Sequence, residues 1–224
     1  MESAKKTKKK SSKVDPSAKI RSGYMDFVLD KGKKPESVYK LCKVLGIKEG
    51  EFYQYYASFK ALEKSIWKEY ASGTIERIKA DSNYAMFNSR ERVLAFYFTL
   101  LERLLEDRSF VTQQLGKWKS PAYPPPFVRK FKKEFDAWAQ EVIAEGLSQG
   151  EIAKRPFLDK RYGDLLWFHL QFVLMFWYKD SSAGFEKTDE AIEKSVNLAF
   201  DIIGKGVLDN ALDFGKFLFQ QSRN

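Results

Sequence analysis

The residue types that carry most enzyme chemistry are scarce in this chain. Its 224 residues include one histidine, His169, and one cysteine, Cys42. A catalytic nucleophile needs a base beside it, and a phosphate site commonly needs a glycine-rich loop of a kind that the sequence lacks. One cysteine can build neither a cysteine-based zinc site nor an intramolecular disulfide, and a lone histidine on an apolar helix is more often a core residue than a ligand. We therefore expect no catalytic residue, no metal and no cofactor.

Positive charge is concentrated at the N-terminus. The formal net charge is +9, and residues 1–14 hold six lysines against one glutamate. This composition cannot form a core, so we expect a disordered basic tail over residues 1–14 and a folded part that is only mildly basic. Such a tail could contact nucleic-acid phosphates without reading the base sequence.

The sequence shows neither a secretory signal nor a membrane span. The basic start is followed by Ser-Ser-Lys-Val-Asp-Pro instead of an apolar signal core. The longest apolar run, Leu165–Tyr178, has 14 residues and contains His169 and Gln171, whereas crossing a bilayer takes about 20 apolar residues. We interpret the run as a buried helix. With a single cysteine, which suits a reducing compartment, these features predict a cytoplasmic protein.

Helical periodicity begins directly after the tail. The first helix is expected to end at Gly32, and a short second one should span about 37–45 before Gly46. A third helix is expected from about Lys48, and a fourth from about Ser58. Three short helices with a glycine between the second and third outline a helix-turn-helix.

The rest of the chain predicts longer helices. The segment from about Ser89 to Glu106 is apolar on too much of its surface for a helix with one wet side, so we expect it to be central. Residues 120–126, SPAYPPP, lack the backbone donors that a helix needs and predict a loop. Further helices are expected at about 127–150, 159–179 and 188–219. No strand-period alternation competes, so the predicted fold class is all-α.

The last of these helices carries an apolar seam. Its members step by three and four positions, which places them on one side of a helix and suits packing against a partner helix. They include Ile192, Val196, Phe200, Ile203, Val207 and Phe214.

The segment 32–62, GKKPESVYKLCKVLGIKEGEFYQYYASFKAL, resembles the DNA-binding signature of the tetracycline-repressor (TetR) family without a gap. In that family a glycine ends the first helix, "S-K-G-T-L-Y-x-H/Y-F" forms the recognition helix, and "S-K-E-A-L" starts the fourth. The matching positions are Gly32, Val38, Leu41, Gly46, Ile47, Gly50, Phe52, Tyr53, Tyr55, Tyr56, Ser58, Ala61 and Leu62. A weaker likeness to the family's ligand domain is EVIAEGLSQGEI at 141–152.

This resemblance implies a two-domain, all-α protein. Residues 15–62 would be the three-helix helix-turn-helix DNA-binding domain, and residues 63–224 a larger helical ligand-binding and dimerisation domain. The resemblance further implies a transcriptional regulator, most simply a repressor, that binds operator DNA as a homodimer and is released by a hydrophobic small molecule. The dimer would form mainly through the last two helices, with the apolar seam at its interface.

A helix in the major groove needs polar side chains in its first turns, and donors beside it that hold phosphates. Together with the resemblance, these needs favour as DNA-binding residues Ser37, Lys48, Glu49, Glu51, Tyr53, Gln54, Tyr55 and Lys60. Lys48 and Lys60 are also compatible with ordinary solvated positions, and Tyr55 is equally compatible with a place in the core.

The expected recognition helix is unusually acidic. Glu49 and Glu51 stand where the family commonly has lysine and threonine, and Glu36 and Phe59 replace a threonine and a lysine. A carboxylate about 4 Å from a phosphate costs about 1 kcal/mol in bulk water and about 4 kcal/mol at an effective dielectric of 20. Yet acids suit a helix N-terminus, and a glutamate can accept a hydrogen bond from cytosine. The alternative hypothesis is a TetR-fold protein that has lost DNA binding and holds a lipid-like or isoprenoid ligand.

Both hypotheses need a ligand cavity among the helices of the larger domain. We expect it to be apolar and at least about 300 Å³ in volume, with His169 or Gln171 as the orienting donor. Candidate lining residues are Phe96, Trp118, Trp138, His169, Phe172 and Phe176. Each of these rings is also compatible with a plain core position.

Overall fold

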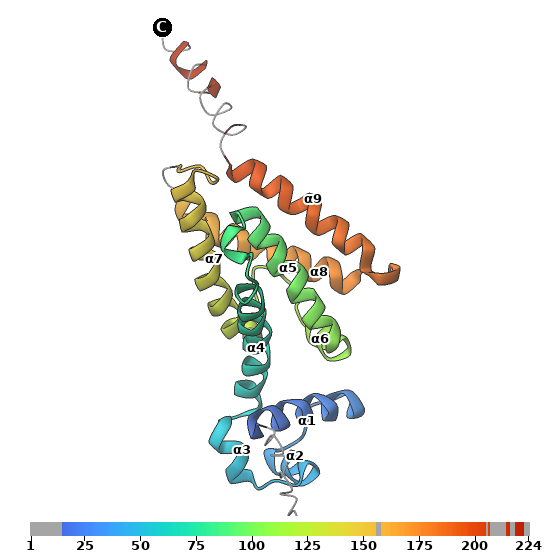
Figure 1. Ribbon diagram of the computed structural model, residues 1–224. Helices are drawn as coiled ribbons and strands as arrows, with labels where there is room; N and C mark the ends of the chain where they lie inside the picture. The colour runs from blue at the N-terminus through green and yellow to red at the C-terminus, as the bar shows by residue number, and fades with distance from the viewer. Residues whose placement is uncertain (1–14, 156–157, 205, 207–213, 216–217, 222–224) are drawn as a thin grey trace, which may run out of the picture. The chain divides into compact units, whose positions relative to one another are not determined.

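The computed structural model describes residues 15–155, 158–204, 206, 214–215 and 218–221. Over these residues the regular secondary structure is helical throughout, so the predicted all-α class is confirmed (Figure 1). The chain divides into two compact units, residues 1–62 and 63–224. No helix of the described part is long and apolar enough to cross a membrane.

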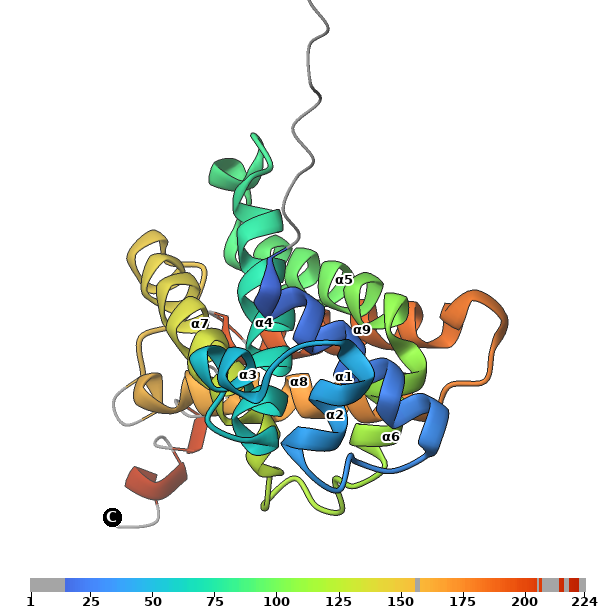
Figure 2. The ribbon, with the colours of Figure 1, turned by 90° about the horizontal axis from the view of Figure 1, so that it is seen from below.

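The smaller unit contains three helices joined by short turns (Figure 2). These are α1 (Pro16–Lys31), α2 (Val38–Leu45) and α3 (Glu49–Tyr55). Gly32 ends α1 and Gly46 ends α2, both with left-handed backbone (φ 66° and 65°), a conformation that glycine adopts without strain. The glycine signals in the sequence therefore set both helix ends.

A small aromatic core fixes α3 to its neighbours. Phe52 of α3 is fully buried, and its ring lies 5.8 Å from that of Phe59 and 5.9 Å from that of Tyr56. Tyr24 of α1 packs on Phe59 at 5.4 Å. The buried Tyr56 accepts a hydrogen bond from Arg21 of α1 through its hydroxyl (3.2 Å). These contacts hold α3 against α1 by one side and leave its other side free.

The larger unit is built around α5 and α8. Its helices are the part of α4 (Phe59–Lys79) after residue 62, α5 (Ser89–Glu106), α6 (Arg108–Leu115), α7 (Arg129–Gln149), α8 (Tyr162–Lys179) and α9 (Glu186–Ile203), with 3-10 turns η1 (Tyr84–Met86), η2 (Pro126–Val128), η3 (Asp159–Arg161) and η4 (Ala183–Phe185). Both α5 and α8 pack against α6, α7 and α9. Residues 120–125 of the predicted SPAYPPP loop lie between α6 and η2, and Pro126 begins η2. The sequence did not predict α6.

The segment 141–152 ties the end of α7 to the start of α5. Arg92 of α5 and Glu145 of α7 form a bidentate ion pair. The Glu151 carboxylate accepts a hydrogen bond from the Ser89 backbone amide (2.8 Å). A Cβ at Gly146 would lie 2.5 Å from the Ser89 hydroxyl oxygen, which is too close for any real contact. Gly146 is therefore required by the close approach of the two helices.

The last long helix is shorter than the sequence predicted. α9 ends at Ile203, and Gly204 beyond it has extended backbone (ψ 173°). The buried Arg155 guanidinium donates to the carbonyls of Ile202 (3.0 Å) and Gly204 (2.7 Å), and so satisfies carbonyls that a continuing helix would use. The prediction of one helix over 188–219 is therefore wrong at its end, although part of that range lies outside the described residues.

Candidate functional site

The residues predicted to recognise DNA lie on the free side of α3 and next to it. Seven of the eight are exposed, and Glu51 is half-buried. Tyr55 is 42% exposed, so it is not a core residue, whereas Tyr56 is buried as its packing requires. Since Phe52 alone among the α3 residues is buried, the small unit does not need the other α3 side chains for its own core.

Two backbone features shape this face. Ser37 caps α2 by accepting a hydrogen bond from the Lys40 amide (3.2 Å), which leaves its hydroxyl hydrogen free to donate outward. A Cβ at Gly50 of α3 would meet nothing within 4 Å. Packing within the chain therefore does not explain this glycine, whereas close approach of a partner to the helix backbone would.

The charge on this face is mixed. Residues 15–62 hold nine lysines and arginines against six aspartates and glutamates. Among the described residues no ion pair neutralises Glu49 or Glu51. Burial raises the pKa of the nearby Cys42 thiol, and the negative charges of the two carboxylates raise it further. The exposed lysines Lys48 and Lys60 flank the two acids in sequence. The face is neither continuously basic nor acidic.

Two of the predicted pocket residues belong to the packed core of the larger unit. Phe96 of α5 stacks on Trp138 of α7 with ring centroids 4.4 Å apart, and both are buried. The Trp138 indole donates to the Tyr84 hydroxyl (2.9 Å). Neither ring lines a cavity described below, so both have a structural role in the core and their assignment to a ligand pocket stays a prediction.

His169 is fully engaged within the chain. Its Nδ1 lies 3.1 Å from the Tyr97 hydroxyl and its Nε2 lies 2.8 Å from the Ser195 hydroxyl of α9. Burial lowers the pKa of His169 to about 4, so the ring is neutral at physiological pH. Phe172 stacks on it, and Phe176 packs on Phe172. None of these three residues lines a cavity described here, so their place in a ligand pocket stays a prediction.

A cavity of about 300 Å³ does lie at the predicted Trp118. It is formed by the end of α6, the loop that follows α6, and α8. The residues that shape it include Leu115, Trp118, Pro121, Gln171, Met175 and Lys179. Of the predicted pocket set, this cavity retains Trp118, and it also includes the suggested donor Gln171.

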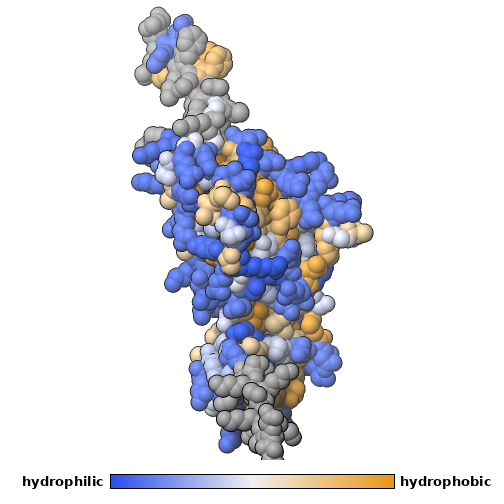
Figure 3. Space-filling view, in the orientation of Figure 1, coloured by the Kyte–Doolittle hydropathy of each residue, from blue (hydrophilic) through white to orange (hydrophobic). Residues whose placement is uncertain are grey.

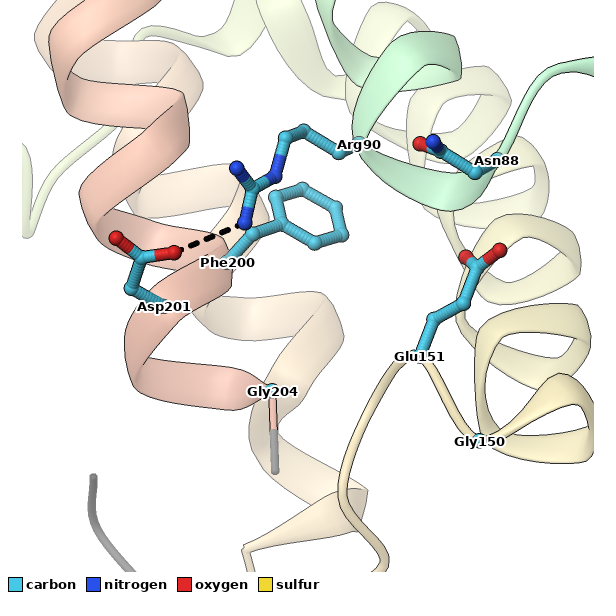
Figure 4. A pocket seen from close by; sticks show the side chains of 7 residues that line it. All are labelled: Asn88, Arg90, Gly150, Glu151, Phe200, Asp201 and Gly204. Carbon is cyan, nitrogen blue, oxygen red and sulfur yellow. Dashed lines mark hydrogen bonds and ion pairs between the residues drawn. The ribbon is translucent and has the colours of Figure 1, made fainter. Parts of the chain in front are cut away.

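A larger cavity, about 580 Å³ in volume, opens between the start of α5, the end of α7 and the end of α9 (Figure 4). Its walls mix polar groups with the Phe200 ring, and several of the polar groups have partners within the chain. Arg90 pairs with Asp201 (2.9 Å) and donates to Asn197 (3.2 Å), while Glu151 is occupied by the Ser89 amide. The Arg90 guanidinium of this cavity is therefore already paired with an acid.

A hydrolase-like motif was overlooked in the sequence. Residues 146–150 read Gly-Leu-Ser-Gln-Gly, which has the Gly-x-Ser-x-Gly spacing of a nucleophile elbow. That motif works at a sharp strand-to-helix turn, whereas here it forms the end of α7. The Ser148 hydroxyl donates to the Glu145 carbonyl (2.7 Å), and His169 is bound elsewhere. The motif forms no nucleophile–base pair among the described residues.

Comparison with known families decides the identity of the larger unit. Residues 92–218 match the family described as tetracyclin repressor-like, C-terminal domain. The chain belongs to the TetR family. It is thus a TetR-family transcriptional regulator, a class of proteins that are not enzymes. No curated protein matches the chain by sequence.

Solved structures of transcriptional regulators share its fold, and the first two below are described as TetR-family members. A regulator from Syntrophomonas wolfei is 19% identical with a TM-score of 0.65, over 86% of this chain and 97% of that one. One from Shewanella sp. PV-4 is 12% identical with a TM-score of 0.57, over 85% and 98%. FadR from Bacillus subtilis, solved in complex with stearoyl-CoA, is 14% identical with a TM-score of 0.52, over 85% and 98%. At these identities the likeness concerns the fold.

The predicted dimer seam of this TetR-family chain faces inward. Its first four members, Ile192, Val196, Phe200 and Ile203, are buried within the protomer, where α9 packs on α5 and α8. They leave no surface for a partner, so their assignment to a dimer interface is corrected. Val207 lies outside the described residues, and Phe214 is 62% exposed.

Other side chains of α8 and α9 expose apolar surface instead. They are Leu165, Phe168 and Phe172 on α8, and Leu198 and Ile202 on α9. The His169–Ser195 hydrogen bond joins the two helices, with His169 between Phe168 and Phe172 and Ser195 three residues before Leu198. Hydrophilic residues interrupt the apolar areas on the face of the larger unit that Figure 3 presents. We call the five exposed residues Leu165, Phe168, Phe172, Leu198 and Ile202 the α8–α9 apolar face.

Proposed function

We propose that this regulator binds a palindromic operator as a homodimer, with α3 in successive major grooves, and leaves it when a hydrophobic small molecule binds the larger unit. The observation that carries the proposal is the free side of α3. Its polar side chains are exposed, and bare backbone at Gly50 permits close approach. A helix so presented fits the major groove, and the two-fold axis of the dimer sets the spacing of the half-sites.

The roles on this face follow from donor chemistry. The Ser37 hydroxyl and the ammonium groups of Lys48 and Lys60 suit phosphates, which fix the register of the helix. Gln54 can pair with adenine through its side-chain amide. The tyrosine hydroxyls of Tyr53 and Tyr55 are further donors, to phosphate or to base.

One observation favours the alternative function. Glu49 and Glu51 carry charges that no ion pair among the described residues offsets, at the place where a phosphate backbone would pass. A TetR-fold protein that has lost DNA binding and carries a lipid-like or isoprenoid ligand would tolerate them. The fold can hold an amphipathic molecule, since FadR was solved with stearoyl-CoA.

Operator selection separates the two functions. Genomic fragments are selected with the full chain, and the best site is titrated at about 150 mM salt, where screening limits surface attraction to about 8 Å. We expect a palindromic site that is bound more tightly than scrambled DNA. A form without residues 1–14 should lose affinity but keep that preference, because the basic tail contacts phosphates and does not read the base sequence. Equal binding to both DNAs would contradict the regulator and support the carrier.

We further expect the dimer to form through the α8–α9 apolar face. Changing Phe168 and Leu198 to glutamate, at positions 60% and 62% exposed, should give monomers at micromolar concentration in light scattering. Each carboxylate occurs twice in a two-fold interface and would be buried without a partner. Tyr123→Glu, on the loop after α6, is the control and should remain dimeric. A dimeric double variant, or a monomeric unaltered protein, would contradict this interface.

A further inference from the structure

The cavity at the end of α6 has a rigid apolar wall. The Trp118 indole donates to the Ser120 carbonyl (2.9 Å), and its ring stacks on that of Trp167 (centroids 6.3 Å, planes 28° apart). Trp118 is buried to 7% exposure although it lines the cavity. Leu115 and Met175 add aliphatic surface. A flat, fixed indole beside a flexible thioether can pack on an apolar ligand body at low entropic cost.

The loop that closes this cavity is held by a specific hydrogen-bond pair. With its amide oriented to satisfy both neighbours, Gln171 of α8 donates to the Pro121 carbonyl (3.0 Å) and accepts from the Trp167 indole (2.9 Å). The side chain predicted as an orienting donor for a ligand is therefore used to position the cavity wall. The donors for a ligand must come from other residues.

Those donors are two exposed lysines at the rim of the cavity. Lys119 and Lys179 both line the cavity, and in the described part of the chain neither forms an ion pair. The Tyr178 hydroxyl also lines it and has no hydrogen-bond partner among the described residues. No aspartate or glutamate occurs among the nine lining residues. The cavity thus combines an apolar wall with two unpaired positive charges.

We propose that this cavity binds an organic carboxylate with an apolar body. The apolar part packs against Trp118 and Met175, and the carboxylate accepts hydrogen bonds from Lys119, Lys179 and the Tyr178 hydroxyl. The volume of about 300 Å³ is at the lower end of small-molecule sites, so the body is a small ring system or a medium-length chain. This inference deepens the proposed function and rests on it for its regulatory meaning.

Matched probes test the charge requirement. Isothermal titration of the full chain with 2-naphthoate and with its neutral analogue 2-naphthamide compares the same ring with and without a charge. Decanoate carries the same charge on an aliphatic chain, so comparing it with 2-naphthoate shows whether the cavity prefers an aromatic acid or a fatty acid. We expect one saturable site per chain for at least one of the acids, and about tenfold weaker binding of the amide where the ring acid is bound.

Variants locate the site. Lys119→Met combined with Lys179→Met should weaken binding of the acid about tenfold and change binding of the amide by less than about twofold, since hydrogen bonds to charged groups are lost. Lys130→Met, an exposed lysine of α7 that lines none of the described cavities, is the control. Met175→Trp fills the cavity and should abolish binding of both ring probes. A melting curve shows whether each variant is folded.

Several results would overturn the inference. They are no binding of either acid at millimolar concentration, equal binding of acid and amide, or acid binding that persists unchanged in the lysine double variant. All are measured without DNA, so the outcome is independent of operator binding. Operator binding without acid binding overturns this inference alone, whereas acid binding without operator binding overturns the regulator and leaves the site in place.

Discussion

Changing Glu49 to lysine and Glu51 to threonine is expected to tighten operator binding by at least about thirtyfold. Each carboxylate near a phosphate costs about 1 kcal/mol in bulk water and more at the lower dielectric of an interface. Removing two such repulsions therefore contributes about 2 kcal/mol or more, and 1.4 kcal/mol corresponds to a tenfold change in affinity. The measurement is fluorescence anisotropy on the selected operator at about 150 mM salt.

Scrambled DNA of equal length controls for the added positive charge. A general charge effect tightens binding to both DNAs equally, whereas relief of repulsion in the groove preserves or increases the preference for the operator. Asp26→Lys combined with Asp30→Thr makes the same change of +3 in net charge at two exposed residues of α1, and shows how much of the effect comes from net charge alone. If the double variant binds the operator no better than the unaltered chain, α3 does not meet DNA and the carrier function gains support.

The second large effect is expected from Phe52→Ala. Its fully buried ring joins α3 to Tyr56 and Phe59, and loss of such a ring costs about 3–5 kcal/mol. A unit of this size rarely has more than about 3–5 kcal/mol of stability from its core. The smaller unit should therefore unfold at room temperature and operator binding should disappear, while residues 63–224 keep their own core.

Thermal unfolding followed by helical circular dichroism checks this prediction. The variant should lose helix signal at low temperature and retain a transition from the larger unit. Tyr53→Ala is the matched control, because this neighbouring side chain is 53% exposed and exposed positions change stability by less than about 0.5 kcal/mol. An unfolding curve identical to that of the unaltered chain would mean that Phe52 is not the centre of the small core.

The smaller unit was well predicted because its signals are local. Gly32 and Gly46 end helices through their own backbone conformation, and Ser37 caps α2 through a bond three residues away. Such features depend on neighbours in sequence, so the pattern alone defines them. The exposure of the other α3 side chains could also be predicted locally, because the buried Phe52 determines which side of this short helix faces the core.

The roles of apolar residues in the larger unit could not be predicted from the pattern. Helical spacing from Ile192 to Ile203 marks a buried face but does not say whether the chain itself or a partner buries it, and here the chain does. Aromatic content likewise does not distinguish the packed Phe96–Trp138 pair from a cavity wall such as Trp118. These distinctions depend on which helices come together.

The Arg155 contact with the end of α9 also has a consequence for folding order. The guanidinium that binds the carbonyls of Ile202 and Gly204 comes from the connection before α8 and is distant in sequence. The Ala153 amide donates to the Ile203 carbonyl beside it (2.9 Å). The last turn of α9 is thus completed only when that connection docks. The connection and this end of the last helix should therefore form late and open together as one cooperative block.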